Sequence, residues 1–167
     1  QSDLEAVIAM LLARDDVDDS NLFLLGASQG GMVSAMTAAD NRDDIAGAVL
    51  LYPAFVLVDG AMEQFDSIDE VPDSTYYLFM TVGRAYFEGL FGYDVYADIQ
   101  GYNKDVLIIH GDRDGLAPLS YSERAVEVLH SAELVVIPGA GHGFSGDSLD
   151  LAVGYITEYL GSHLNAG

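Results

Sequence analysis

The chain alternates short apolar runs with longer amphipathic stretches, and this pattern predicts its secondary structure. Four apolar runs end at turn residues and predict buried strands at residues 22–25, 45–51, 106–109 and 134–137. Apolar residues at helical spacing predict helices at residues 4–12, 32–39, 120–129 and 149–160. Ser120 and Glu123 form an expected capping box at the start of the third helix. Strands that are apolar throughout and alternate with helices predict an α/β fold, a parallel sheet of about four strands covered on both faces.

Residues 54–103 break this alternation. Their hydrophobic periodicity is poor, and bulky aromatic residues crowd together in the segment: Tyr76, Tyr77, Phe79, Tyr86, Phe87, Phe91, Tyr93, Tyr96 and Tyr102. The remaining residues follow the strand–helix pattern, and a chain of 167 residues is long enough to bury the core of one domain.

Charge and composition exclude several classes of partner. The chain has 27 acidic and 6 basic residues, a formal net charge of −21, so its surface repels nucleic acids and anionic membranes. It has no cysteine, which excludes disulfides and thiolate metal sites. No apolar run is long enough to span a membrane and no signal peptide is visible, so we expect a cytoplasmic protein. Because Gln1 begins inside a helical pattern, we also expect that an upstream part is missing.

The end of the first predicted strand carries a G-x-S-x-G motif, Gly26-Ala27-Ser28-Gln29-Gly30. A serine on a tight strand-to-helix turn projects its hydroxyl above the sheet, where it can act as a nucleophile. We expect side chains at Gly26 or Gly30 to collide with neighbouring backbone in that turn. The Gln29 amide, at the start of the following helix, is the predicted first oxyanion donor. The alternative is an ordinary glycine-rich turn.

The ends of the third and fourth predicted strands carry a carboxylate and a histidine. Asp112 and Asp114 follow the third strand, and either could orient an imidazole or merely cap its turn; spacing alone does not choose between them. His142 lies between glycines after the fourth strand, on an accessible loop suited to a general base, although a surface histidine would look the same. The order Ser, Asp, His at successive strand ends favours a catalytic triad. We interpret His110 as structural, and His130 and His163 as surface residues at helix ends.

The whole chain resembles the α/β-hydrolase superfamily, and more closely the bacterial cinnamoyl and feruloyl esterases. The matching stretches are LFLLGASQGGMVSAMTAA, VLIIHGDRDGLAPLSYSERA and ELVVIPGAGHGFSG. The resemblance implies that Ser28 is the nucleophile, Asp114 rather than Asp112 the acid, and His142 the base. It also implies that residues 1–167 are the C-terminal portion of a catalytic domain. Further strands, and the loop that donates the second oxyanion amide, would precede them.

The resemblance places a small lid over the active site where the aromatic segment lies, at about 54–103. Flat aromatic walls suit a hydroxycinnamate acyl group, but the rings could equally form the core of the lid itself. The implied activity is that of a serine esterase acting on a small-molecule carboxylic ester, with no metal and no organic cofactor. The alternatives are another hydrolase of this fold (a peptidase, thioesterase or lipase) or a non-catalytic ligand receptor.

Overall fold

The computed structural model describes residues 1–77 and 80–164. The chain forms two compact units, Val56–Val95 and the remainder, Gln1–Phe55 with Tyr96–Gly167. The larger unit contains the four strands that the sequence predicts. They are β1 (Phe23–Ala27), β2 (Gly47–Leu51), β5 (Asp105–Gly111) and β6 (Ser131–Ile137).

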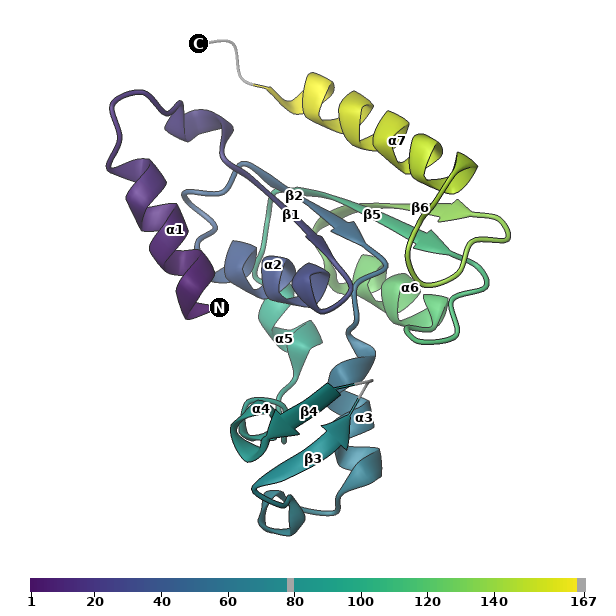
Figure 1. Ribbon diagram of the computed structural model, residues 1–167. Helices are drawn as coiled ribbons and strands as arrows, with labels where there is room; N and C mark the ends of the chain where they lie inside the picture. The colour runs from purple at the N-terminus through teal and green to yellow at the C-terminus, as the bar shows by residue number, and fades with distance from the viewer. Residues whose placement is uncertain (78–79, 165–167) are drawn as a thin grey trace. The chain divides into compact units, whose positions relative to one another are not determined.

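All four strands are parallel and pair in the order β1-β2-β5-β6 (Figure 1). The register aligns their carboxyl ends, since Ala27 lies opposite Leu51, and Leu51 opposite Ile109. Each strand therefore delivers the loop that follows it to the same edge of the sheet. In parallel sheets this is the edge at which functional side chains gather.

Helices cover both faces of the sheet. Helices α2 and α6 lie on one face and α7 on the other (Figure 1). The helices of this unit are α1 (Ser2–Leu12), α2 (Gln29–Asp40), α5 (Val95–Ile99), α6 (Leu119–Val128) and α7 (Asp147–His163), with a 3-10 turn η1 (Asp19–Asn21). None of the helices in the described residues is long and apolar enough to cross a membrane.

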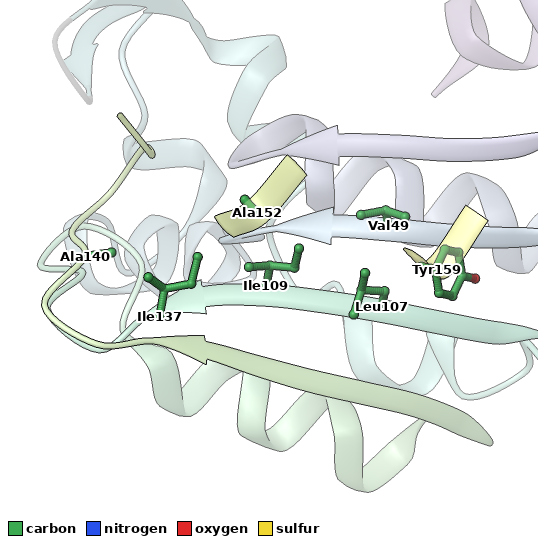
Figure 2. Close-up of a cluster of buried hydrophobic side chains, with 7 residues drawn as sticks. All are labelled: Val49, Leu107, Ile109, Ile137, Ala140, Ala152 and Tyr159. Carbon is green, nitrogen blue, oxygen red and sulfur yellow. The ribbon is translucent and has the colours of Figure 1, made fainter. Parts of the chain in front are cut away.

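The core between the sheet and α7 fixes that helix on its face. Leu107 and Ile109, two residues apart on β5, point to the same side of the sheet because side chains alternate along a strand. There they meet Ala152 and Tyr159, which are two helical turns apart on α7 (Figure 2). The Tyr159 hydroxyl also donates to the Asp105 carbonyl (2.6 Å) at the start of β5. Together these contacts anchor both ends of the helix that follows the His142 loop.

The smaller unit has an aromatic core of its own. Its elements are α3 (Val56–Gln64), η2 (Ile68–Glu70), the antiparallel strands β3 (Ser74–Tyr77) and β4 (Met80–Gly83), and α4 (Arg84–Glu88). Phe87 is fully buried, and its ring packs edge-on against Phe65, Tyr77 and Tyr86 at centroid distances of 5.1–5.5 Å. These rings therefore pack on one another. Phe79, named among the aromatic residues of the segment, lies outside the described residues.

Two aromatic residues of the predicted segment belong to the sheet unit instead. The Tyr96 ring packs on Phe55 at 5.7 Å, and the guanidinium of Arg124 lies 3.9 Å from its centre. The Tyr102 side chain is buried, and its hydroxyl donates to the Ile45 carbonyl at 3.1 Å. Burial raises the pKa of the Tyr102 phenol well above its usual value, so the group remains a neutral donor.

The capping box predicted at Ser120 and Glu123 is wrong. Helix α6 begins at Leu119, and its N-cap is Pro118, which makes no side-chain capping bond. Ser120 therefore lies inside the first turn, where it is no longer the N-cap residue of a capping box.

Candidate active site

Ser28 occupies a strained turn between β1 and α2. Its φ is 53°, a left-handed value that non-glycine residues rarely adopt and that costs on the order of 1–3 kcal/mol. Several backbone hydrogen bonds hold it there. Its amide donates to the Leu51 carbonyl (2.9 Å), and its own carbonyl accepts from the amides of Gly31 and Ala54 (both 2.9 Å). Hydrogen bonds to Leu51 at the end of β2 and to Ala54 after that strand therefore hold the turn in place. The turn lifts the Ser28 side chain above the edge of the sheet.

The two glycines of the motif have different roles. A Cβ atom built on Gly26 would lie 2.1 Å from the Gly30 carbonyl oxygen, so only glycine fits at position 26. A Cβ atom on Gly30 would meet nothing within 4 Å. The expectation of a collision is therefore right for Gly26 and wrong for Gly30. Gly30 is the second residue of α2 and is exposed. Its backbone carbonyl is the group that restricts position 26, whereas position 30 itself has room for a side chain.

The Gln29 amide is the first N–H of α2. It donates to no acceptor among the described residues, whereas the amides of Gly31 and Met32 are already bonded to the Ser28 carbonyl. An amide at a helix N-terminus next to Ser28 is placed where negative charge is stabilised by the helix dipole. Its use as an oxyanion donor remains a prediction.

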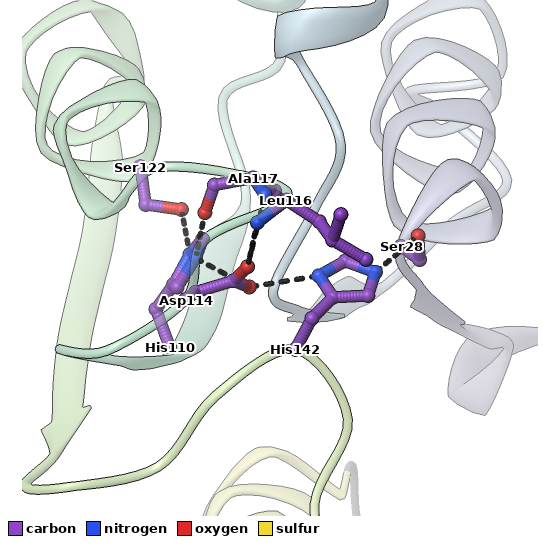
Figure 3. A network of polar contacts seen from close by, with 7 residues as sticks. All are labelled: Ser28, His110, Asp114, Leu116, Ala117, Ser122 and His142. Carbon is purple, nitrogen blue, oxygen red and sulfur yellow. Dashed lines mark hydrogen bonds and ion pairs between the residues drawn. The ribbon is translucent and has the colours of Figure 1, made fainter. Parts of the chain in front are cut away.

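Ser28, His142 and Asp114 meet at the carboxyl edge of the sheet, although 114 residues separate Ser28 from His142 (Figure 3). The His142 Nε2 atom lies 2.8 Å from Ser28 Oγ, and its Nδ1 atom lies 2.8 Å from Asp114 Oδ2. Because an ionised carboxylate only accepts, Nδ1 carries the proton. Nε2 then has a free lone pair and accepts the hydrogen bond of the Ser28 hydroxyl. A general base needs this arrangement, because the same lone pair takes the proton during the reaction.

The Asp114 carboxylate is fully enclosed and richly hydrogen-bonded. Its side chain is 0% exposed, and its Oδ1 atom accepts the amides of Leu116 and Ala117, both at 2.9 Å. Burial alone would raise the pKa of Asp114, but the bonds from these amides and from His142 outweigh burial and lower it. Asp114 is therefore an anion at neutral pH and faces the ring that gains positive charge when it takes a proton.

Asp112, the competing carboxylate, lies elsewhere. It is exposed, and its Oδ1 atom accepts the Gly139 amide at 2.6 Å. This bond ties the loop after β5 to the loop after β6, so Asp112 holds together the two loops that carry Asp114 and His142. The geometry brings Asp114 and not Asp112 to the imidazole.

Tyr52 is a site residue that the sequence analysis did not identify. It follows β2, its φ is 37°, and its amide donates to the Ile109 carbonyl at 2.7 Å. Its ring lies edge-on to His142 (centroids 4.9 Å apart) and to Phe144 (4.9 Å). Burial, and secondarily the charge of Asp114, raise the pKa of the Tyr52 phenol. The only sequence signal was the Tyr52-Pro53 pair that ends a strand.

The other histidines also have defined places. His110 is fully buried at the end of β5, as expected for a structural residue. His130 is exposed just after α6, and His163 ends α7, where its ring stacks on Tyr159 at 4.2 Å. Among the described residues, no group of three or more His, Asp or Glu side chains is arranged to hold a metal ion.

Comparisons with solved structures identify the class of fold. The chain superposes on Est1E from Butyrivibrio proteoclasticus with a TM-score of 0.88 at 25% identity, covering 97% of this chain and 68% of that one. Est1E with bound ferulic acid gives a TM-score of 0.87, also at 25% identity, over 97% and 66%. A monoacylglycerol lipase from Paleococcus ferrophilus shares the fold at 18% identity, with a TM-score of 0.67 over 98% and 74%.

The parallel sheet, the strained serine turn and these neighbours define an α/β-hydrolase. The profile of the prolyl oligopeptidase family (Peptidase_S9) matches residues 1–166, and the chain therefore belongs to that family. A search of curated protein sequences gave no match. The chain spans about two thirds of the length of Est1E.

Proposed function

We propose that the protein is a serine esterase that hydrolyses carboxylic esters through an acyl-enzyme formed on Ser28. One observation carries the proposal: a continuous line of hydrogen bonds from Ser28 Oγ through His142 to Asp114, each link 2.8 Å long. A surface histidine or a plain glycine turn needs no such alignment. The strained backbone of Ser28 adds support, since strain of this kind gathers at functional sites.

The reaction follows from the positions of the protons. As Ser28 Oγ attacks the ester carbonyl, His142 Nε2 takes the hydroxyl proton, and the positive ring is stabilised by the Asp114 carboxylate. The Gln29 amide donates to the developing oxyanion. His142 then protonates the leaving alcohol, which departs. A water molecule, losing its proton to His142, attacks the acyl-enzyme and releases the acid, and Ser28 regains its proton.

For the acyl group we propose a hydroxycinnamate. The support is the likeness at 25% identity to Est1E, which has been solved with ferulic acid bound. We also propose that the aromatic segment at about 54–103 contains the lid of the site, as the resemblance implies. The mutual packing of Phe65, Tyr77, Tyr86 and Phe87 indicates that these four rings form a core within the unit Val56–Val95. Tyr76 is exposed (68%) and lies outside this group of packed rings.

A second candidate function is that of a peptidase, favoured by the match to the prolyl oligopeptidase family over residues 1–166. A panel of p-nitrophenyl acetate, methyl ferulate and a prolyl p-nitroanilide separates the two. We expect kcat/KM to be highest on methyl ferulate. Faster cleavage of the anilide would support the peptidase, and faster cleavage of simple aliphatic esters would support a lipase-like or general esterase.

Labelling with a fluorophosphonate probe tests the nucleophile in the full-length protein. The wild-type protein and a Ser145→Ala control, altered at an exposed serine of the loop that carries His142, should both label. Ser28→Ala should not label and should lose on the order of 10⁶ in kcat. A correctly folded wild-type protein that neither labels nor hydrolyses any ester would instead support a non-catalytic ligand receptor.

A further inference from the structure

A second imidazole lies behind the Asp114 carboxylate. His110 is fully buried, and both of its ring nitrogens have partners (Figure 3). Nδ1 lies 2.7 Å from the Ser122 hydroxyl, while Nε2 lies 2.8 Å from the Ala117 carbonyl oxygen and 3.3 Å from Asp114 Oδ2. The proposed reaction does not use this ring, yet it touches the same carboxylate oxygen as His142.

The partners of His110 fix its tautomer. The Ala117 carbonyl and the Asp114 carboxylate are acceptors only, so Nε2 must carry a proton. Burial lowers the pKa of His110, and the charge of His142 lowers it further. The Ala117 bond and the Asp114 charge oppose this shift without cancelling it. The ring is therefore neutral at neutral pH, and its Nδ1 atom accepts the proton of the Ser122 hydroxyl.

The Nδ1–H of His142 donates to Asp114 Oδ2 at 2.8 Å, and the Nε2–H of His110, which is bonded to the Ala117 carbonyl at 2.8 Å, lies beside the same carboxylate oxygen at 3.3 Å. The other oxygen is held by the amides of Leu116 and Ala117. The His110 N–H adds a second positive dipole beside Oδ2, and this one takes no part in the proposed reaction. Because Ser122 on α6 is itself fully buried and bonded to Nδ1, the His110 ring is held with Nε2 on the Ala117 carbonyl and beside Asp114 Oδ2.

We propose that His110, locked by Ser122, is a positioning residue that holds Asp114 Oδ2 in line with His142 Nδ1 during acyl transfer. The proposal rests on the proposed esterase mechanism. His110 contacts no reacting atom and acts only through Asp114. Without this N–H, Oδ2 loses the polar hydrogen that lies beside it and keeps only the bond from His142, so the carboxylate is held less firmly against the catalytic ring. Loss of the His110 N–H would also leave the Ala117 carbonyl without its hydrogen-bond donor.

Two substitutions at position 110 in the full-length protein separate positioning from packing. His110→Leu removes the donor, whereas His110→Gln retains an N–H at the end of a side chain of similar reach. We expect His110→Leu to lower kcat for ester hydrolysis about tenfold with KM unchanged, since a carboxylate that is held less firmly orients and stabilises the His142 ring less well. His110→Gln should recover most of the loss. Leu and Gln variants that keep the wild-type kcat, or that lose it equally, would overturn the proposal.

A third variant covers the case in which His110→Leu does not fold. Ser122→Ala leaves His110 in place but removes the group that orients its ring. We expect kcat to fall several-fold with KM unchanged, while nitrogen NMR of the imidazole still shows the Nε2–H tautomer that the Ala117 carbonyl requires. An unchanged kcat or an Nδ1–H tautomer in the wild-type protein would contradict the inference.

The same set of proteins distinguishes this inference from the proposed function. If the wild-type protein does not label with fluorophosphonate, or if Ser28→Ala remains active, the esterase proposal itself fails. If the wild-type protein labels and Ser28→Ala does not, while His110→Leu and Ser122→Ala match the wild-type kcat, only the role of His110 is refuted.

Discussion

Substituting Gly26 by alanine places a methyl group against the backbone of the turn that carries Ser28. The new Cβ atom would lie 2.1 Å from the Gly30 carbonyl oxygen and 2.5 Å from the Gly30 carbonyl carbon. The shorter contact is about 1.4 Å inside the optimal separation of non-bonded atoms. Because both atoms belong to the backbone of α2, neither can rotate away as the end of a side chain would. The start of the helix must move instead.

The cost can be estimated from overpacking of other cores. Inserting a methyl group where backbone must shift costs about 3 kcal/mol of unfolding free energy. The shift also displaces Ser28 and the Gln29 amide, which lie between positions 26 and 30. Since misplacement of a reacting group by about 1 Å lowers rates on the order of 100-fold, we expect a loss of this size in kcat/KM on esters.

Gly30→Ala is the matched control, because it makes the same chemical change four residues away. No atom lies within 4 Å of its new Cβ, and alanine is a better helix former than glycine by up to about 1 kcal/mol. We expect this variant to be as stable as the wild-type protein or slightly more so, with ester hydrolysis retained.

Urea unfolding followed by circular dichroism measures the stability of the two variants, and the rate of fluorophosphonate labelling reports the position of Ser28. The reasoning predicts a large difference between Gly26→Ala and Gly30→Ala in both measurements. Equal behaviour of the two variants, whether both are tolerated or both are damaging, would refute it.

Two further predictions concern the carboxylates. Asp114→Asn should lower kcat on the order of 10⁴-fold, because an amide disturbs the His142 tautomer. Asp112→Asn alters only the bond to Gly139 and should change the rate of ester hydrolysis little. A larger loss of kcat in the Asp112 variant than in the Asp114 variant would reverse the assignment of the acid. Folding lowers the pKa of Asp114, so the ionised carboxylate stabilises the native state. This stabilisation is fully present above the pKa of the unfolded chain, about 3.9, and is lost as the pH falls through the lower pKa of the folded state. The difference in unfolding free energy between the wild-type protein and Asp114→Asn should therefore be constant from about pH 5 to 7 and shrink below about pH 4, as urea titrations at each pH will show; a difference that grows on acidification would contradict the sign.

The sequence by itself determined the sheet, the order of its strands along the chain and the class of site. Apolar runs and helical spacing are local signals, and each of the four predicted strands is present with its end within two residues of the expected position. The G-x-S-x-G motif marks its own turn, because a tight turn limits which residues can occupy it. Ser28 and His142 could be named for the same reason, since both lie directly after a strand and the carboxyl ends of parallel strands share one edge.

Only the tertiary structure decided questions that depend on which distant atoms meet. Spacing could not choose between Asp112 and Asp114, and the resemblance implied Asp114 without a physical reason. The structure gives that reason, because Asp112 accepts the Gly139 amide and Asp114 faces the His142 ring. Gly26 and Gly30 look equivalent in the motif, yet only one Cβ would strike backbone. No motif in the sequence marks the roles of Tyr52 and His110. Tyr52 contacts the His142 ring and His110 lies beside the Asp114 carboxylate only because the folded sheet brings their strand ends together. Local sequence patterns predict helices, strands and turns. Contacts between these elements depend on how distant parts of the chain pack together, and no single stretch of sequence encodes that.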